Sequence, residues 1–381
     1  MGGVYRRVCS PALMKMEMVS LLNAVIFLFF VLGAADYLWG GRWGLGRDFE
    51  RGIQCSGQLM LVMVGFLSLS PILGSVLGPA VTPFFRALGA DPSLLAGIFL
   101  ASDSGGAPLA QALSLDSQAG RYNGYLVASM LGGTMMCIIP MSMLNTKKEN
   151  RPAVIYGLVV GLFSVPFGCL AGGLLGGFSP RVLLWNTAPV AGCSLLLILL
   201  LVFFRDRILR PFRFFSRLLI GVSLAGFILA AQKELLGLSP LAGLEPFGGI
   251  MLIIGDIALM LGGLFPLMGA VTRLLQSPIR RLASRWSLEA GEIKAILVTA
   301  VNPFPTLGQL NEMAPKGAFL NCAFMVCANC ALGDHLAYTM KMAPELTPAV
   351  AAGKLFGGLI ALLVSSALAP RLLGGRGRES I

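Results

Sequence analysis

Apolar stretches longer than the thickness of a membrane constrain this chain more than any other feature. A helix needs about 20 apolar residues to cross the hydrocarbon core of a bilayer. The sequence is 56% hydrophobic and only 12% charged, whereas a soluble domain carries about 25% charged residues. It therefore predicts an all-α, polytopic transmembrane helix bundle of about nine to eleven spans. We expect uninterrupted helices at 18–39, 57–79, 122–145, 153–177, 183–204, 216–236, 249–275, 317–340 and 350–373.

Two further apolar segments, 92–113 and 290–313, contain sequences that break helices. The first includes Gly-Gly followed by Ala-Pro, and the second includes Asn-Pro-Phe-Pro. Such sequences interrupt the helical hydrogen bonds, which membranes tolerate only where protein or a cavity surrounds the backbone. We predict two broken or re-entrant helical elements, with hinges at Gly105, Gly106, Pro303 and Pro305.

The two breaks fall at matching places in the chain. When the helix at 183–204 is left out, the order helix, helix, broken element, helix, helix occurs twice, which predicts inverted repeats. Interrupted segments in matching halves indicate a transporter with its site at the breaks. The expected organisation is an N-terminal extension at 1–15, a first membrane repeat at 16–182, a linking helix and basic loop at 183–215, a second membrane repeat at 216–373 and a C-terminal tail at 374–381.

The net charge of +11 comes mainly from short basic loops between the apolar runs. This distribution is typical of cytoplasmic loops that face anionic lipid, and aromatic residues do not interleave with the clusters. We therefore expect membrane lipid, and no nucleic acid, as a partner. If both broken elements re-enter, the basic loops are all cytoplasmic and the N-terminus lies outside; if both cross, it lies inside. We favour the first arrangement, while ion coupling and an oligomer stay open.

Aspartates inside apolar segments need a reason, because each costs about 2.5–3.5 kcal/mol to insert. Asp103 is the strongest candidate, since it lies within the first break between Ser102 and Ser104. A carboxylate there can neutralise a cation and give it directional hydrogen bonds. The alternative is that Asp103 caps the second half of the broken element. Asp36 is interpreted as an interfacial, structural residue, and Asp256 stays an open candidate.

The second half of the chain offers its own polar candidates. Asp334 and His335 end an apolar run, either as an interfacial turn or as a second wall of the same site, where His335 adds sensitivity to pH. At the second break, Asn302 can donate or accept hydrogen bonds, and Phe304 can offer a π face to an ammonium group. The alternative for Asn302 is hydrogen bonding between helices.

The cysteines favour helix packing over metal binding. Cys327-x-x-Cys330 near His335 has a metal-like spacing, but no second Cys or His pair accompanies it, and His335 is the only histidine. Thiols inside membrane segments usually act as small packing residues. We expect neither a metal nor a cofactor.

Several runs along the chain resemble the EutH family. They occur in matching order from about residue 18 to residue 370, nearly the whole chain. Asp103 and Asp334 both fall within them, whereas Asp256, the N-terminal extension and the tail after Pro370 depart from the pattern. The runs are Gly65–Pro71, Gly78-Pro79, Leu88–Ser93, Ala96-Gly97, Ser102–Gly106, Pro166–Gly173, Asn321–Phe324, Ala331–Leu336 and Gly353–Gly358.

The resemblance implies a bacterial inner-membrane permease, not an enzyme, that takes up ethanolamine as ethanolammonium for ethanolamine catabolism. It also implies that uptake matters most at low pH. A primary amine has a pKa near 10 by the lysine reference, so each unit of acidification leaves about tenfold less neutral amine to cross lipid unaided.

Two other functions stay open from the residues alone. One is transport of another small cationic or amphipathic solute, since only the resemblance selects ethanolamine. The other is an intramembrane aspartyl protease built on Asp103 and Asp334, although the usual signatures around such aspartates are absent. That chemistry needs two carboxyls that share a proton, so a large separation between them would exclude it. The sequence contains no Walker motif, which argues against direct drive by ATP.

Overall fold

A computed structural model describes residues 11–204, 207, 209–238 and 241–373, and these residues form helices and no strand. Within this part of the chain, eight helical segments are long and apolar enough to cross a membrane. Seven of them are α1 (Pro11–Leu38), α2 (Leu45–Ala87), α7 (Arg151–Gly176), α8 (Pro180–Phe203), α9 (Leu209–Leu236), α10 (Phe247–Leu274) and α16 (Thr347–Leu373).

The eighth segment is largely π-helical. It runs through α5 (Ser117–Arg121), η2 (Tyr122–Gly132), η3 (Thr134–Ile138) and α6 (Ile139–Asn145). Every residue of η2 is buried. Wide π turns are uncommon and often occur at functional sites, so the middle of this segment is a natural wall for a site.

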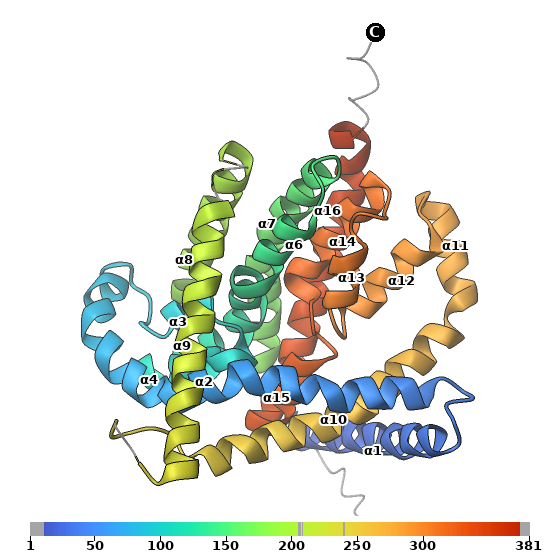
Figure 1. Cartoon of the computed structure of the whole chain (residues 1–381). Coiled ribbons are helices and arrows are strands. Elements are labelled where there is room, and N and C mark those ends of the chain that lie inside the picture. The colour runs from blue at the N-terminus through green and yellow to red at the C-terminus, as the bar shows by residue number, and fades with distance from the viewer. Residues whose placement is uncertain (1–10, 205–206, 208, 239–240, 374–381) are drawn as a thin grey trace, which may run out of the picture.

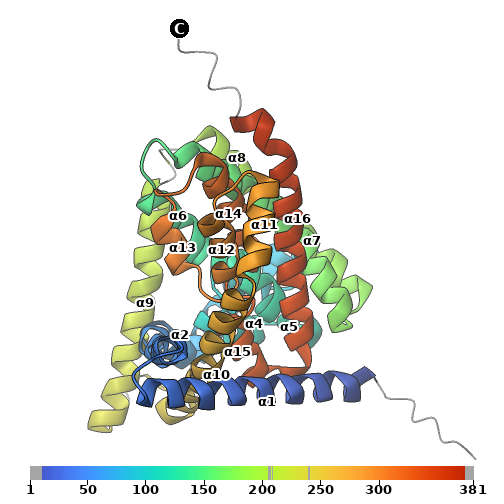
Figure 2. The ribbon, with the colours of Figure 1, turned by 90° about the vertical axis from the view of Figure 1, so that its right-hand side faces the viewer.

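The helices form two groups that cross at a steep angle. In Figures 1 and 2, α1, α2 and α10 pack against one another in a layer across one end of a bundle that includes α7, α14 (Pro315–Ala328) and α16. Helix α9 packs across α2 and runs alongside the bundle. The basic helix α11 (Gln276–Trp286) continues from α10.

Helices α7 and α16 touch through glycines. A Cβ added at Gly168 would lie 2.9 Å from the carbonyl oxygen of Gly353, and one added at Gly353 would lie 2.8 Å from the Cα of Gly172. Small residues at such spacings let two helix backbones meet inside a membrane protein. This contact fixes the position of α16 against α7.

Both predicted breaks are present. The first separates α3 (Leu94–Phe99) from α4 (Ala107–Leu113), with η1 (Ser102–Gly106) between them. Gly105 adopts φ 98°, and a Cβ there would collide with Phe66, so the chain can turn here only because this residue is glycine. The second break lies between α12 (Ala290–Thr299) and α13 (Phe304–Gln309).

The expected helix at 317–340 was wrong. The chain forms α14, turns through Asn329–Gly333 and resumes as α15 (Asp334–Met342) and η4 (Pro344–Leu346). Cys330 has φ 51° in this third break, and neither short helix is long enough to span. This explains why eight segments, rather than nine, meet the length requirement.

Other boundaries also shift. Helix α2 extends well beyond the expected 57–79 and continues through three prolines. Helix α1 begins at Pro11, so part of the expected 1–15 extension is helical; the rest of that extension and the 374–381 tail lie outside the described residues. The inverted repeat and the membrane orientation stay predictions.

Candidate functional site

The first and third breaks meet face to face inside the bundle. Asp103 lies in η1, and Asp334 and His335 begin α15. The Nε2 atom of His335 lies 3.5 Å from Oδ1 of Asp103. One donor atom from each of Asp103, Asp334 and His335 lies within 4.8 Å of the others. The structure therefore brings together three of the residues that the sequence singled out from opposite halves of the chain.

Hydrogen bonds from neighbouring residues hold the two aspartates in place. The hydroxyl of Ser104 donates to Oδ1 of Asp103 at 3.1 Å, and the backbone N–H of His335 donates to Oδ1 of Asp334 at 2.9 Å. The third break is also fastened to the second: Cys330 N–H donates to the Thr299 carbonyl at 3.1 Å, and Leu332 N–H donates to the Ala300 carbonyl at 2.6 Å. All three breaks are thus joined around one site.

A lysine completes the site. Lys354 on α16 is fully buried, and its ammonium donates to the carbonyl oxygen of Ser129 on η2. The same Nζ lies 3.0 Å from Nδ1 of His335. Because the other ring nitrogen faces Asp103, His335 lies between a carboxylate and an ammonium. We refer to Asp103, Asp334, His335 and Lys354 together as the carboxylate cluster.

The carboxylate cluster is nearly sealed from solvent. Asp103 is 3% exposed and His335 is 4% exposed, whereas Asp334 is half-buried. Charges interact more strongly in such surroundings than in water, because less solvent screens them. With His335 neutral, two carboxylates and one ammonium would leave one net negative charge.

The same spacing bears on metal binding. Three donor atoms within 4.8 Å would suit a small metal ion by distance alone. The Lys354 ammonium, however, lies against the ring nitrogen of His335 and already brings a positive charge to the group. An organic ammonium, which needs hydrogen-bond acceptors rather than a full coordination shell, fits this arrangement better.

The remaining predicted residues divide between the cluster and its surroundings. Ser102 is buried beside Asp103, and its hydroxyl has no hydrogen-bond partner within the described chain. Asn302 accepts the backbone N–H of Phe304 at 2.9 Å and so caps α13. Phe304 is 43% exposed, and neither residue makes a hydrogen bond or ion pair to the carboxylate cluster. The hinge residues Gly106, Pro303 and Pro305 lie within or directly beside the breaks.

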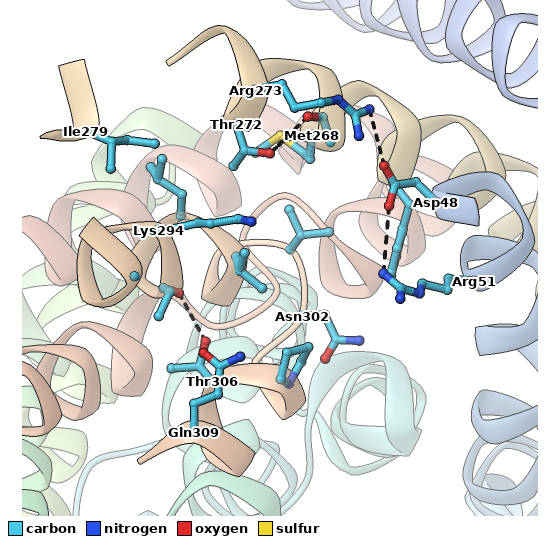
Figure 3. Close-up of a pocket in the computed structure, with 18 of the residues that line it drawn as sticks. Asp48, Arg51, Met268, Thr272, Arg273, Ile279, Lys294, Asn302, Thr306 and Gln309 are labelled. Carbon is cyan, nitrogen blue, oxygen red and sulfur yellow. Dashed lines mark hydrogen bonds and ion pairs between the residues drawn. The ribbon is translucent and has the colours of Figure 1, made fainter. Parts of the chain in front are cut away.

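A large cavity approaches the carboxylate cluster from the side of the second break. Its volume is about 1050 Å³, and α2, α10, α11, α12 and α13 line it. Figure 3 shows Lys294 reaching toward the middle of this space and Asp48 between Arg51 and Arg273. Besides Cys55, the titratable residues that line this space are four basic side chains and one acidic side chain: Arg51, Arg273, Arg280, Lys294 and Asp48. We call this space the basic cavity.

Only a thin wall separates the basic cavity from the carboxylate cluster. Val301 lines the cavity, and a Cβ added at Gly333 would collide with the Val301 carbonyl oxygen. Gly333 directly precedes Asp334 in the chain. The backbone contact between Val301 and Gly333 therefore lies between the basic cavity and Asp334.

Other polar residues have structural partners. Asp36 accepts the backbone N–H groups of Trp43 and Gly46 at 2.9 and 2.8 Å, which fixes the turn after α1. Asp256 forms an ion pair with Lys341 near the end of α15. Asn321 donates to the Glu292 carbonyl at 3.0 Å. These contacts favour the structural interpretation of all three.

The sequence interpretation missed Lys354 as a site residue. Gly353-Lys354-Leu355 belongs to one of the family-like runs, from which no site role was predicted for the lysine. The signal was present, because a lysine inside an apolar run costs about as much to insert as an aspartate. Applying that argument to cations as well as to carboxylates would have found it.

Comparison with known proteins agrees with the resemblance. The model of the family described as "Ethanolamine utilisation protein, EutH" matches residues 18–368. The chain belongs to the EutH family. It is a multi-pass protein of the bacterial inner membrane, as its eight apolar helical segments in the described residues and its relatives indicate.

Two relatives of this EutH protein illustrate the match. A Listeria monocytogenes protein named "Probable ethanolamine permease EutH" is 35% identical over 358 residues, covering 94% of this chain and 96% of the relative. A Salmonella typhimurium protein of the same name is 32% identical over 352 residues, covering 86% of each chain. No solved structure matches this chain.

Proposed function

We propose that this protein carries protonated ethanolamine across the inner membrane, by facilitated diffusion or secondary transport, and so supports ethanolamine catabolism. The observation that carries the proposal is the meeting of Asp103 and Asp334, within 4.8 Å of His335, where three helix breaks converge. Relatives named as ethanolamine permeases support the choice of cargo. The role is that of a transporter and not of an enzyme.

Ethanolammonium has an ammonium at one end and a hydroxyl at the other, and the site offers partners for both. The two carboxylates provide acceptors for the three N–H donors of an ammonium. The Ser102 hydroxyl is buried without a hydrogen-bond partner among the described residues, and it adjoins Asp103 in the chain. An unsatisfied buried hydroxyl is costly, and hydrogen bonding to the substrate hydroxyl removes that cost.

A protein path for the cation matters most in acidic surroundings. Each unit of acidification leaves about tenfold less neutral amine, since the amine pKa is near 10. The carboxylate cluster binds the abundant charged form, which lipid excludes.

The test is uptake of labelled ethanolamine into proteoliposomes at acidic external pH by the Asp103→Asn variant. Truncating one side of a buried charge pair costs about 2–5 kcal/mol, so we expect uptake to fall by at least about 30-fold. The matched control is Asp256→Asn, an aspartate whose partner Lys341 lies outside the cluster; this variant keeps its uptake. Undiminished uptake by correctly folded Asp103→Asn would refute the proposal.

The geometry gives one specific reason to weigh an intramembrane aspartyl protease. A large distance between the two carboxyl groups would have excluded a protease, but oxygens of Asp103 and Asp334 lie within 4.8 Å of each other. However, a protease dyad needs one carboxyl to keep a proton. His335 beside Asp103, with Lys354 behind it, favours an ionised Asp103 instead. Cleavage of membrane peptides that Asp334→Asn abolishes would favour the protease.

A transporter of another small cation is the remaining alternative. Competition of labelled ethanolamine binding by choline and by small diamines distinguishes it, since the proposed cargo should compete best. Imposed proton and sodium gradients across the same proteoliposomes separate facilitated diffusion from secondary transport.

A further inference from the structure

Lys354 is a buried charge that the proposed function does not use. It is fully buried on α16, and its Nζ contacts the Ser129 carbonyl and Nδ1 of His335. Among the described residues, no carboxylate lies within ion-pair distance of this ammonium. Buried cations are normally paired directly with an acid, so this placement calls for an explanation.

Titratable side chains from several neighbouring elements surround the ammonium of Lys354. Among them, only His335 can carry a positive charge, and it does so only when it is protonated. The thiols are neutral when protonated. The negative charges that stabilise the ammonium are therefore those of the two aspartates, acting through and around His335. The titratable neighbours are Asp103 on η1, Asp334 and His335 on α15, Cys330 in the third break, Cys327 on α14 and Cys169 on α7.

The position of Lys354 is fixed both by its helix and by its ammonium. The preceding residue, Gly353, lies against the carbonyl oxygen of Gly168 and the Cα of Gly172, so α16 is held at backbone contact with α7. The Ser129 carbonyl receives the ammonium from the other side. The positive charge of Lys354 is therefore a fixed part of the site, whereas the charge of a substrate comes and goes.

We propose that Lys354 determines the charge of the cargo: it offsets one of the two cluster carboxylates, so that the site accepts a monovalent ammonium and discriminates against divalent amines. This inference rests on the proposed function, because it assumes that the carboxylate cluster binds the cargo. With Lys354 in place, the cluster has one net negative charge when His335 is neutral. Without Lys354 it has two, which matches a diamine.

The experiment is equilibrium binding of labelled ethanolamine to the purified full-length protein, with 1,3-diaminopropane and propylamine as competitors at neutral pH. The diamine carries two charges at this pH, because each amine ionises in the range of a lysine. One additional unit charge at about 10 Å, screened by an effective dielectric constant near 20, changes binding by roughly tenfold. We expect Lys354→Met to shift the preference toward the diamine by about tenfold relative to propylamine.

Two control variants separate charge from structure. Lys354→Arg keeps the charge and should keep the wild-type preference. Lys341→Met removes a lysine that pairs with Asp256 outside the cluster, and it should also leave the preference unchanged. Equal loss of monoamine and diamine binding in Lys354→Met would show a structural role only and would overturn the inference.

A double variant keeps the test decisive if Lys354→Met does not fold. Asp334→Asn removes one negative charge and weakens ethanolamine binding, and Lys354→Met added to it restores the wild-type net charge. We expect the double variant to bind ethanolamine about tenfold more tightly than Asp334→Asn alone; equal or weaker binding would overturn the inference. If Asp103→Asn does not change binding, the proposed function itself fails, whereas an unchanged diamine preference beside a defective Asp103→Asn refutes only the role of Lys354.

Discussion

The carboxylate cluster and the basic cavity lie on opposite sides of one short stretch of backbone, Ala300–Val301. In the carboxylate cluster, Asp103, His335 and Lys354 are buried and the two aspartates can supply negative charge, whereas the charged side chains that line the basic cavity are four cations and one aspartate. If a cation reaches the cluster through the cavity, it meets repulsion first and attraction afterwards. We expect selection to take place in the cluster.

The aspartates of the two regions differ in their partners. Asp48 in the basic cavity faces Arg273 at 3.4 Å and Arg51 at 3.9 Å, whereas Asp334 has no arginine or lysine within ion-pair distance among the described residues. Asp48 is thus already neutralised by the protein, and Asp334 is available to a cation. We therefore expect a cation to bind at Asp334 and not at Asp48.

The largest effect should come from removing the negative charge of Asp334. Asp334→Asn is expected to lower ethanolamine uptake by at least about 30-fold, because a buried carboxylate that binds a cation contributes about 2 kcal/mol or more. Asp48→Asn should change uptake by no more than about threefold, since its charge acts on two arginines near solvent. Initial rates of uptake by the two variants in proteoliposomes provide the measurement. Similar losses of uptake in the two variants would contradict the proposed difference between the carboxylate cluster and the basic cavity.

A second contrast uses glycines of the two regions. Gly105→Ala should lower the free energy of unfolding by about 1–3 kcal/mol, because φ of 98° is strained for alanine and the new methyl collides with Phe66. Gly291→Ala, on the cavity wall, meets no atom within 4 Å and should have little effect. Thermal unfolding of both variants in the same detergent checks this. A stable Gly105→Ala would mean that the first break is not fixed by its backbone turn.

The smallest effect belongs to the basic cavity. Lys294→Gln removes one exposed positive charge and should raise the apparent affinity for ethanolamine by about two- to threefold at low salt, with the gain lost near 1 M salt. Uptake measured at low and high ionic strength tests this. A large loss of uptake instead would place Lys294 in the binding step and remove the functional separation of cavity and cluster.

The sequence could predict most of the architecture because its signals are local. Gly-Gly and Pro-x-Pro disrupt a helix wherever they occur, so the first two breaks were found from residues alone. The third break was missed because Asn329–Gly333 is short and mostly apolar, and its turn depends on Cys330 at φ 51° and on hydrogen bonds to Thr299 and Ala300. Those partners lie about thirty residues away in sequence, beyond any local pattern.

The acidic residues of the candidate site could be predicted from the sequence, but the way in which the breaks come together could not. The cost of burying charge identified Asp103 and Asp334, and neighbouring motifs added His335. Asn302 and Phe304 were predicted from the second break, yet the structure uses Asn302 to cap α13 and leaves Phe304 43% exposed. Which breaks face each other is decided by packing between distant helices, and one sequence does not reveal this.

The backbone contact between α7 and α16 limits how the protein can change shape. No layer of side chains lies between Gly168, Gly172 and Gly353 that could repack to let the helices slide. We therefore expect these two helices to move together, and Lys354 to move with them. Asp103 and Asp334, by contrast, lie near the beginning of the short helices η1 and α15. We expect any opening of the site between these elements to separate opposite charges, and a bound cation to lower the work of that separation.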